Sequence, residues 1–352
     1  MPRIAVLPGD GIGVEVTRET VKVLETLRDA FRCDRALEHF DFGAERYLRD
    51  GTTLPEEAFA RFRDEFDAIF AGAFGDPRIP DMAHARDILL GLRFRLDLYV
   101  NLRPVRLYDD RLTPLRGKTA RDIDIVIFRE NTEGLYCGSG GFLKKGTADE
   151  VAINEDVNTR KGVERILRAA FAYARRRGRK RLCMTDKSNV LRYAHDLWQR
   201  TFAEVRAEYP DVESSHMFVD ALAMQLVLKP EQFDVIVGCN MFGDIVSDLG
   251  AAIAGGLGLA ASGNIHPGRV SLFEPVHGSA PKHAGHDRAN PLAAILSAAL
   301  MLEHLGLAGE AAAVEQAVRR TIAQGHVTAD LGGSHGTAAV GDFVCRALRD
   351  QA

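Results

Sequence analysis

The sequence lacks every cysteine pattern that builds a disulfide frame or a zinc site. Its five cysteines (33, 137, 183, 239 and 345) are scattered, with no CxxC pair and no His/Cys ligand spacing. This distribution is typical of free thiols in a reducing compartment. The chain also lacks an excess of one charge, because 45 basic residues nearly balance 49 acidic ones and leave a net charge of −4. A nucleic-acid-binding protein that works through bulk electrostatics is therefore disfavoured.

No hydrophobic run is long enough to cross a membrane, since the glycine-rich stretch 251–263 is shorter than the about 20 residues of a spanning helix. The N-terminal segment MPRIAVLPGDG does not have the design of a signal peptide, so we expect a cytoplasmic protein. Internal repeats, low-complexity tracts and Pro- or Ser-rich linkers are also missing. The one basic cluster, 175–181, follows a helical pattern, which indicates a solvated helix end and turn.

What the chain does contain is an alternation of strand-like and helix-like segments, which predicts an α/β fold. Its 352 residues exceed the usual size of one core, so two domains are expected. Because no linker separates them, we expect the two domains to share a continuous sheet. Three strand patterns, 123–130, 180–187 and 233–240, end in polar residues. Ligands gather at the carboxyl ends of strands in open α/β sheets. The glycine-rich segment 138–146 reads as an arm or an exposed hairpin.

The most informative feature is the pair Asp244 and Asp248. The apolar spacing over 242–253 predicts a helix, on which residues four apart share a face. Two carboxylates on one face repel each other unless a cation lies between them. Such hard oxygen ligands suit Mg²⁺ or Mn²⁺. The alternative is that acids in a first helical turn merely offset the helix dipole, and the spacing alone favours that alternative.

Four other patterns carry chemistry. The glycines of PGDGIG (8–13) lack the full dinucleotide fingerprint, so a tight strand-to-helix turn is the better interpretation. Arg93, Arg103 and Arg129 suggest a di- or tricarboxylate substrate, because guanidinium groups match carboxylates. Lys187 lies at the end of a strand pattern, where a lysine beside a metal site is able to act as a base; the alternative is an ordinary surface lysine. The loop 274–290 is able to wrap a nucleotide through free N–H groups, or is only a loop.

Taken together, these segments resemble the isocitrate and 3-isopropylmalate dehydrogenase family of β-decarboxylating dehydrogenases. The segments that carry the resemblance, in family order, are PGDGIG, LDLYVNLRP, FRENTEGLY, DKSNVL, VDALAMQLV, FDVIVGCNMFGDIVSDLGA, EPVHGSAP and ANPLAAILSAALMLEHLG. They extend over nearly the whole chain, and the C-terminal TADLGG also fits. The resemblance reverses the preference at Asp244 and Asp248 in favour of a metal site.

The resemblance implies an isopropylmalate dehydrogenase-like α/β fold of two domains with a shared sheet, which is not a Rossmann fold. The larger domain, 1–98 plus 256–352, would carry most of the nucleotide site. The smaller domain, 99–255, would carry the metal and acid/base residues and the dimer interface. The family also implies a homodimer whose two active sites are shared between subunits.

The resemblance assigns roles residue by residue. It implies that Tyr136, Lys187 and Asp220 are catalytic. It implies a metal site for Mg²⁺ or Mn²⁺ formed by Asp244, Asp248 and Asp220, of which Asp220, like Lys187, comes from the other subunit. Substrate binding falls to Arg93, Arg103, Arg129, Arg86, Leu89, Leu90 and Asn189. Nucleotide binding falls to Glu274, His277, Gly278, Ser279, Ala280, Lys282 and Asn290.

Cofactor and substrate choice depend on departures from the family pattern. Lys282 stands where NAD-dependent members usually carry an aspartate, which makes NADP the alternative, whereas the C-terminal ADLGG and His283 favour NAD. Leu89 and Leu90 match the apolar pocket of isopropylmalate enzymes. Because they lie three or four residues from Arg93 or from Arg86, we expect the four side chains to share one helical face. Arg86 replaces the usual glutamate and is able to pair with a γ-carboxylate.

The expected reaction is metal-dependent oxidative decarboxylation of a substituted D-malate. We expect 3-isopropylmalate, converted to 2-oxoisocaproate in leucine biosynthesis, with D-malate or tartrate next and homoisocitrate or isocitrate after these. A non-catalytic regulatory subunit is an alternative of another class, but such subunits typically lose one of the site residues, and all are present here. A metal-dependent hydrolase would explain neither the arginines nor the nucleotide loop.

Overall fold

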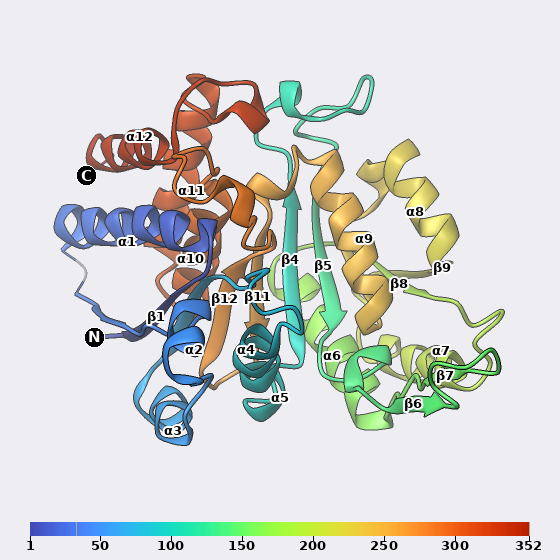
Figure 1. Ribbon diagram of the computed structural model, residues 1–352. Coiled ribbons are helices and arrows are strands. Elements are labelled where there is room, and N and C mark those ends of the chain that lie inside the picture. The colour runs from blue at the N-terminus through green and yellow to red at the C-terminus, as the bar shows by residue number, and fades with distance from the viewer. Residues whose placement is uncertain (33, 352) are drawn as a thin grey trace. The chain divides into compact units, whose positions relative to one another are not determined.

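The computed structural model describes residues 1–32 and 34–351, and these residues form two compact units. The first unit comprises Met1–Leu98, Arg106–Ala120 and Ala251–Ala352, and the second comprises Tyr99–Val105 and Arg121–Gly250. Helices and strands alternate along the chain, so the predicted α/β class is confirmed (Figure 1). Within the described residues, no helix has both the length and the apolar character needed to span a membrane.

The first unit has a five-stranded sheet portion in the order β2-β1-β3-β12-β11. Its strands are β1 (Arg3–Gly9), β2 (Ala36–His39), β3 (Ala68–Ala73), β11 (Ala261–Ile265) and β12 (Ser271–Pro275). Its helices are α1 (Ile12–Phe31), α2 (Ala44–Asp50), α3 (Glu56–Glu65), α4 (Ala83–Ala85), a π-helical turn (Arg86–Leu90), α5 (Gly91–Arg95), α10 (Leu292–His304), α11 (Ala308–Ala323) and α12 (Thr337–Arg349). The sheet is mixed, because β11 runs antiparallel to β12 while β1, β2, β3 and β12 pair in parallel.

Burial explains why this unit holds its shape. Strand β3 is buried along its full length, and helix α10 is buried nearly all round and packs against β11 and β12. A helix that is apolar on all sides belongs inside a core. Amphipathic α1 and α12 pack against each other, as Figure 1 also shows.

The second unit has the strand order β4-β5-β10-β8-β9. Its strands are β4 (Val100–Arg106), β5 (Asp124–Glu130), β6 (Gly140–Leu143), β7 (Val151–Asn154), β8 (Arg181–Asp186), β9 (Glu213–Phe218) and β10 (Val235–Gly238), and its helices are α6 (Arg160–Arg176), α7 (Ala194–Arg206), α8 (Val219–Leu228) and α9 (Asn240–Ile253). The second unit also has short 3₁₀ turns at Leu135–Cys137 and Pro230–Gln232, and the first unit has them at Asp110–Leu112, Leu257–Leu259, Pro281–His283 and Ala329–Leu331.

Several sequence-based expectations are confirmed here. Strands β5 and β8 end at the predicted polar residues, whereas β10 already ends at Gly238, two residues before Asn240. The basic cluster lies where α6 ends. The predicted exposed hairpin is the antiparallel pair β6 and β7, all of whose residues are exposed. Of the five cysteines, Cys137, Cys183, Cys239 and Cys345 are free thiols, and Cys33 lies outside the described residues.

The PGDGIG segment is the tight strand-to-helix turn that its composition predicts. Gly9 and Gly11 have φ angles of +73° and +56°, in the left-handed region that favours glycine. A Cβ atom on Gly11 would lie 2.2 Å from the carbonyl oxygen of Ser279, and the amide of Ile12 donates to that oxygen at 2.8 Å. The turn therefore packs directly on the loop that the sequence assigns to the nucleotide.

Candidate active site

The two aspartates of α9 lie one helical turn apart in the second unit, and Arg103 bridges them. Its Nη2 atom lies 3.1 Å from Asp244 Oδ1 and its Nη1 atom 3.3 Å from Asp248 Oδ1. Arg103 Nη1 also donates to Ser247 Oγ at 2.7 Å. This guanidinium is the cation that a same-face pair of carboxylates requires. Its Nε atom is buried and has no hydrogen-bond partner among the described residues, so one donor remains for a ligand.

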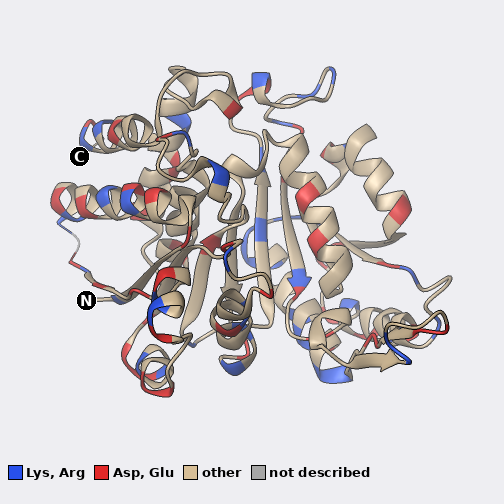
Figure 2. Cartoon of the chain, viewed as in Figure 1, with Lys and Arg blue, Asp and Glu red and all other residues tan. Residues whose placement is uncertain are grey.

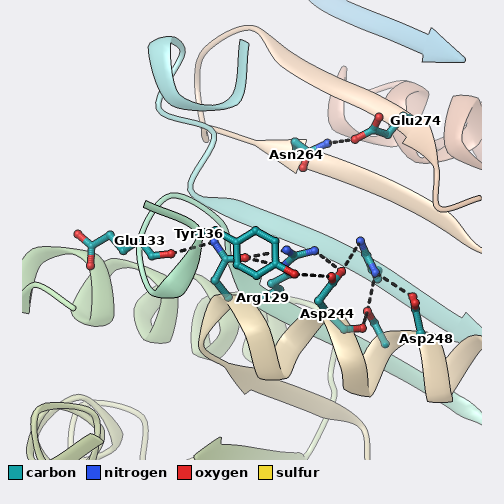
Figure 3. A network of polar contacts seen from close by, with 10 residues as sticks. Arg129, Glu133, Tyr136, Asp244, Asp248, Asn264 and Glu274 are labelled. Carbon is teal, nitrogen blue, oxygen red and sulfur yellow. Dashed lines mark hydrogen bonds and ion pairs between the residues drawn. The ribbon is translucent and has the colours of Figure 1, made fainter. Parts of the chain in front are cut away.

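Arg129 reaches Asp244 from the end of β5. Its Nη1 pairs with Asp244 Oδ1, while Nε and Nη2 donate to the Asn240 side-chain oxygen at 2.9 and 2.7 Å. The residue is only 2% exposed, so this charge depends on Asp244 and Asn240 for its compensation. Figure 3 shows the arginine between the tyrosine ring and the helix.

Tyr136 completes the network on Asp244. Its hydroxyl donates to Asp244 Oδ2 at 3.0 Å, and the guanidinium carbon of Arg129 lies 5.1 Å from the centre of its ring (Figure 3). One carboxylate thus accepts from two arginines and one tyrosine. Tyr136 is 39% exposed, so its hydroxyl is accessible to a ligand.

Two carboxylates, of the buried Glu130 and the half-buried Glu133, anchor the loop that carries Tyr136. Glu130 accepts from the amide of Thr132 at 3.0 Å and from the amide of Glu133 at 2.8 Å. Burial raises the pKa of Glu130, although these hydrogen bonds act in the opposite direction. Glu133 in turn accepts from the amide of Thr159 at 2.8 Å, and its carbonyl oxygen accepts from Asn240 Nδ2 at 2.9 Å.

Asp248 is the more exposed of the two aspartates, with 57% of its side chain accessible against 31% for Asp244. Burial of its carboxyl group raises the pKa of Asp248, Arg103 lowers it, and Asp244 raises it again. A bound divalent cation would favour the ionised form of both carboxylates. Their oxygen atoms are hard ligands that fit Mg²⁺ or Mn²⁺.

The other two acid/base candidates form a separate pair. Lys187 follows β8 and donates to Asp220 Oδ1 on α8 at 2.5 Å. The hydrogen bond from Lys187 lowers the pKa of Asp220, whose side chain is 67% exposed. Asn189 lies exposed in the turn after Lys187. Within residues 1–32 and 34–351, no group of three His, Cys, Asp or Glu side chains is placed to hold a metal ion. The structure therefore brings Asp244 and Asp248 together, but not Asp220 with them.

The candidate nucleotide loop lies in the first unit. Glu274 on β12 accepts from Asn264 at 2.8 Å (Figure 3). Asn290 accepts from the amide of Leu292 at 3.0 Å and donates to Asp330 at 3.0 Å. Burial lowers the pKa of His277, whose Nε2 is buried and has no hydrogen-bond partner among the described residues. Gly278 is exposed, Ser279 buried, Ala280 half-buried and Lys282 exposed. An unsatisfied imidazole nitrogen in a loop of this kind fits a bound polar group.

The segment before Arg93 differs from the expected regular helix. Residues Arg86–Leu90 form a π-helical turn between α4 and α5, so the spacing argument for one shared α-helical face is wrong there. A π turn inserts a residue into the helical repeat, which rotates the preceding side chains relative to those that follow. Leu89, Leu90 and Arg93 are half-buried and Arg86 is exposed. Their proposed roles at the substrate stay predictions.

Sequence reasoning missed Asn240 and Ser247. Both hydrogen-bond the substrate-binding arginine candidates, as described for Arg129 and Arg103. Asn240 is the polar residue at the end of the strand pattern 233–240, and this position is the signal that would have indicated its role. Ser247 has no such signal, because its role depends on which strand packs against α9.

Comparison with known proteins places this geometry in a family. The family described as "Isocitrate/isopropylmalate dehydrogenase" matches residues 3–344 of the chain. A protein from Thermobifida fusca (strain YX), named 3-isopropylmalate dehydrogenase, is 49% identical over 351 residues, which covers 99% of this chain and 98% of the relative. The chain belongs to the isocitrate/isopropylmalate dehydrogenase family.

Further relatives of the family support the same assignment. A Corynebacterium jeikeium (strain K411) protein, also named 3-isopropylmalate dehydrogenase, is 50% identical over 350 residues, covering 99% of this chain and all of the relative. The crystal structure of isocitrate dehydrogenase from Methylococcus capsulatus superposes with a TM-score of 0.89 at 38% identity, covering 99% of this chain and 100% of that one. The resemblance inferred from the motifs and the non-Rossmann α/β fold are thereby confirmed.

Proposed function

We propose that this protein is a 3-isopropylmalate dehydrogenase, which converts 3-isopropylmalate to 2-oxoisocaproate and CO₂ with reduction of NAD, in the cytoplasm. The observation that carries this proposal is the network on Asp244, where two arginines and a tyrosine hydroxyl meet one carboxylate. The names and full-length coverage of relatives at 49% and 50% identity support this substrate over others.

The chain's own groups match the needs of the reaction. Arg103 and Arg129 present guanidinium donors for the substrate carboxylates. Asp244 and Asp248, together with Asp220 of the partner subunit, would hold Mg²⁺ or Mn²⁺, which when bound supplies Lewis-acid polarisation at the C2 hydroxyl. Lys187 of the partner subunit accepts the hydroxyl proton as hydride leaves C2. Tyr136 delivers a proton to C3 as CO₂ leaves from the C3 carboxylate. One proton is released and one is taken up, so the step balances.

The proposed homodimer rests on exposed apolar side chains of the second unit. Helix α8 exposes Met224, Val227 and Leu228, at 55%, 42% and 56%, and α9 exposes Ile245 at 59%. Figure 2 shows that neither helix carries a Lys or Arg. The hairpin β6 and β7 exposes Phe142 and three more apolar residues. Apolar surface of this kind is typical of subunit interfaces.

A subunit-mixing experiment tests whether the active sites are shared. Lys187→Ala and Asp244→Asn are each expected to abolish activity as homodimers. In a randomly exchanged mixture, half of the dimers are hybrids with one intact site each, so about a quarter of wild-type activity should return. No recovery in verified hybrid dimers would contradict shared sites. A Lys187→Ala homodimer with full activity would contradict the catalytic role of Lys187 itself.

The substrate is tested by comparing kcat/KM across 3-isopropylmalate, D-malate, tartrate, isocitrate and homoisocitrate, each with NAD and with NADP and with Mg²⁺ present. We expect 3-isopropylmalate with NAD to be the best pair. Rapid turnover of D-malate beside negligible turnover of 3-isopropylmalate would refute the substrate. A clear preference for NADP would instead assign Lys282, exposed in the nucleotide loop, to a 2′-phosphate.

Isocitrate is a further candidate, after D-malate and tartrate, because of Arg86. Its side chain is 60% exposed, and its Nε atom lies 3.6 Å from the carboxylate of the neighbouring Asp87. A guanidinium so exposed is able to bind an additional substrate carboxylate. An Arg86→Leu variant that loses isocitrate turnover and keeps 3-isopropylmalate turnover would show that Arg86 has this function. Equal losses on both substrates would argue against it.

A further inference from the structure

The backbone of Lys187 is held by a histidine side chain that neither the motifs nor the proposed function uses. The amide of Lys187 donates to His195 Nδ1 at 2.8 Å. Lys187 follows the last residue of β8, where regular ladder pairing with β9 stops at Asp186. A partly buried amide at such a point needs an acceptor from elsewhere. His195, eight residues later in the first turn of α7, supplies it.

His195 is locked in place on several sides. It is 1% exposed, its amide donates to the carbonyl oxygen of Leu191 at 3.1 Å, and its ring lies edge-on to Phe242 with 5.5 Å between centroids. Burial lowers the pKa of His195, so the ring is neutral near pH 7. Because Nδ1 accepts from Lys187, the ring proton belongs on Nε2, which lies 3.9 Å from Asp156 Oδ2.

The residues on either side of Lys187 are anchored as well. The buried carboxylate of Asp186 accepts from the amide of Ser188 at 3.0 Å, from Gln199 Nε2 at 2.7 Å, and shares a 2.8 Å contact with His216 Nε2. The backbone around Lys187 is thus fixed from α7 and from β9. Only the lysine side chain extends outward, to Asp220 at 2.5 Å.

We propose that His195 is a positioning residue for the acid/base lysine: by accepting a hydrogen bond from the Lys187 amide, it fixes where the ammonium group is presented. This rests on the proposed function, in which Lys187 exchanges a proton with the substrate. The reason that one backbone hydrogen bond matters is geometric. Proton transfer requires donor and acceptor within hydrogen-bonding distance, and a misplacement of about 1 Å costs on the order of a hundredfold in rate.

The test compares two substitutions that differ in one property. His195→Leu fills a similar volume without an acceptor, whereas the side-chain oxygen of His195→Asn is able to take the place of Nδ1. We expect His195→Leu to lower kcat by about tenfold or more while the KM values for 3-isopropylmalate and NAD change by less than about twofold. His195→Asn should restore most of kcat. Equal kcat losses in both variants, or wild-type kcat in His195→Leu, would overturn the proposal.

Two controls keep this inference separate from the proposed function. Lys187→Ala, measured in the same assay, should be inactive; if it is inactive and His195→Leu is as active as wild type, only the role of His195 fails. Full activity of Lys187→Ala would remove the proposed function of the lysine. If His195→Leu does not fold, native-state hydrogen exchange at the Lys187 amide of the wild-type protein decides. Strong protection is expected, and exchange at the rate of an unstructured peptide would overturn the hydrogen bond.

Discussion

Gly243 allows α9 to pack closely against Arg129, one of the two arginines that pair with Asp244. A Cβ atom at this position would lie 2.7 Å from Arg129 Cβ, 2.8 Å from its Cγ and 3.1 Å from its Cα. Gly243 is helical, so Gly243→Ala would by itself stabilise the helix by about 1 kcal/mol. The clash opposes this gain, because overpacking of this kind costs about 1 to 3 kcal/mol.

The larger effect is on the hydrogen bonds of Arg129. If its backbone and stem move away from α9, its two bonds to Asn240, at 2.9 and 2.7 Å, are strained or lost. Hydrogen bonds to charged groups are worth about 1.5 to 3 kcal/mol each. Subtracting the helix gain from the cost of overpacking and one such bond, we expect Gly243→Ala to destabilise the protein by about 1.5 to 5 kcal/mol.

The displaced guanidinium should also bind the substrate less well. Loss of one charged hydrogen bond to the substrate in the transition state, about 1.5 to 3 kcal/mol, corresponds to a decrease of about 10- to 160-fold in kcat/KM. Urea unfolding measures the stability and initial rates with 3-isopropylmalate measure the activity. The matched control is Gly309→Ala in α11, where a Cβ meets no atom within 4 Å. That substitution should keep activity and raise stability by about 0.5 to 1 kcal/mol. A Gly243→Ala protein that behaves like the control would refute the reasoning.

Three further predictions follow from particular contacts. Burial alone would raise the pKa of Asp234, but hydrogen bonds from the side chain and the amide of Arg181 outweigh it, so the pKa is lowered. The carboxylate therefore stabilises the fold above about pH 4, and this contribution is lost as the pH falls through the folded pKa. Asp234→Asn should therefore lower the unfolding free energy at pH 7 by about 1 to 2 kcal/mol, with the difference closing below about pH 3 in acid-unfolding curves; a difference independent of pH would contradict this. Buried Asp10 accepts from the amides of Ala44 and Gly75 at 2.6 and 2.8 Å and contacts His84 Nε2 at 2.8 Å. Asp10→Ala should therefore lower the unfolding free energy, measured in urea, by about 3 to 5 kcal/mol. A decrease of less than about 1 kcal/mol would show that these groups find other partners. Chelation of the metal by EDTA should abolish activity without unfolding the protein. Titration calorimetry should find that Mn²⁺ binds at least about tenfold more tightly when 3-isopropylmalate is present. Equal Mn²⁺ affinities with and without the substrate would exclude coupling between metal and substrate binding.

The sequence was sufficient wherever a short-range pattern decides the structure. Strand patterns that end in polar residues correctly located Arg129 and Asp186 at strand ends, and the i,i+4 spacing correctly put Asp244 and Asp248 on one helical face. These features depend on periodicity over about ten residues, which can be recognised directly in the sequence. The motif resemblance then extended the reading to the whole family fold.

The remaining contacts depend on which segments pack together, and local patterns do not contain that information. The bridge from Arg103 to Asp244 and Asp248 joins residues 141 and 145 positions apart through the packing of β4 and α9. The π-helical turn at Arg86–Leu90 is another case, because regular helical spacing fits its sequence equally well. His195 carried no motif at all, and only the fold reveals that its ring accepts from Lys187.

Charge explains why metal and substrate should bind together at this site. Arg103 and Arg129 contribute two positive charges, and Asp244 and Asp248 offset them with two negative ones, so the cluster of these four side chains is close to neutral. A divalent cation alone would place two further charges beside two guanidinium groups, and a dicarboxylate alone would compete with the aspartates for those groups. When both bind, the cation takes the aspartate oxygens and releases the arginines to the substrate carboxylates, and the total charge returns to near zero. Each ligand therefore lowers the cost of binding the other, and linkage requires the two effects to be equal in free energy.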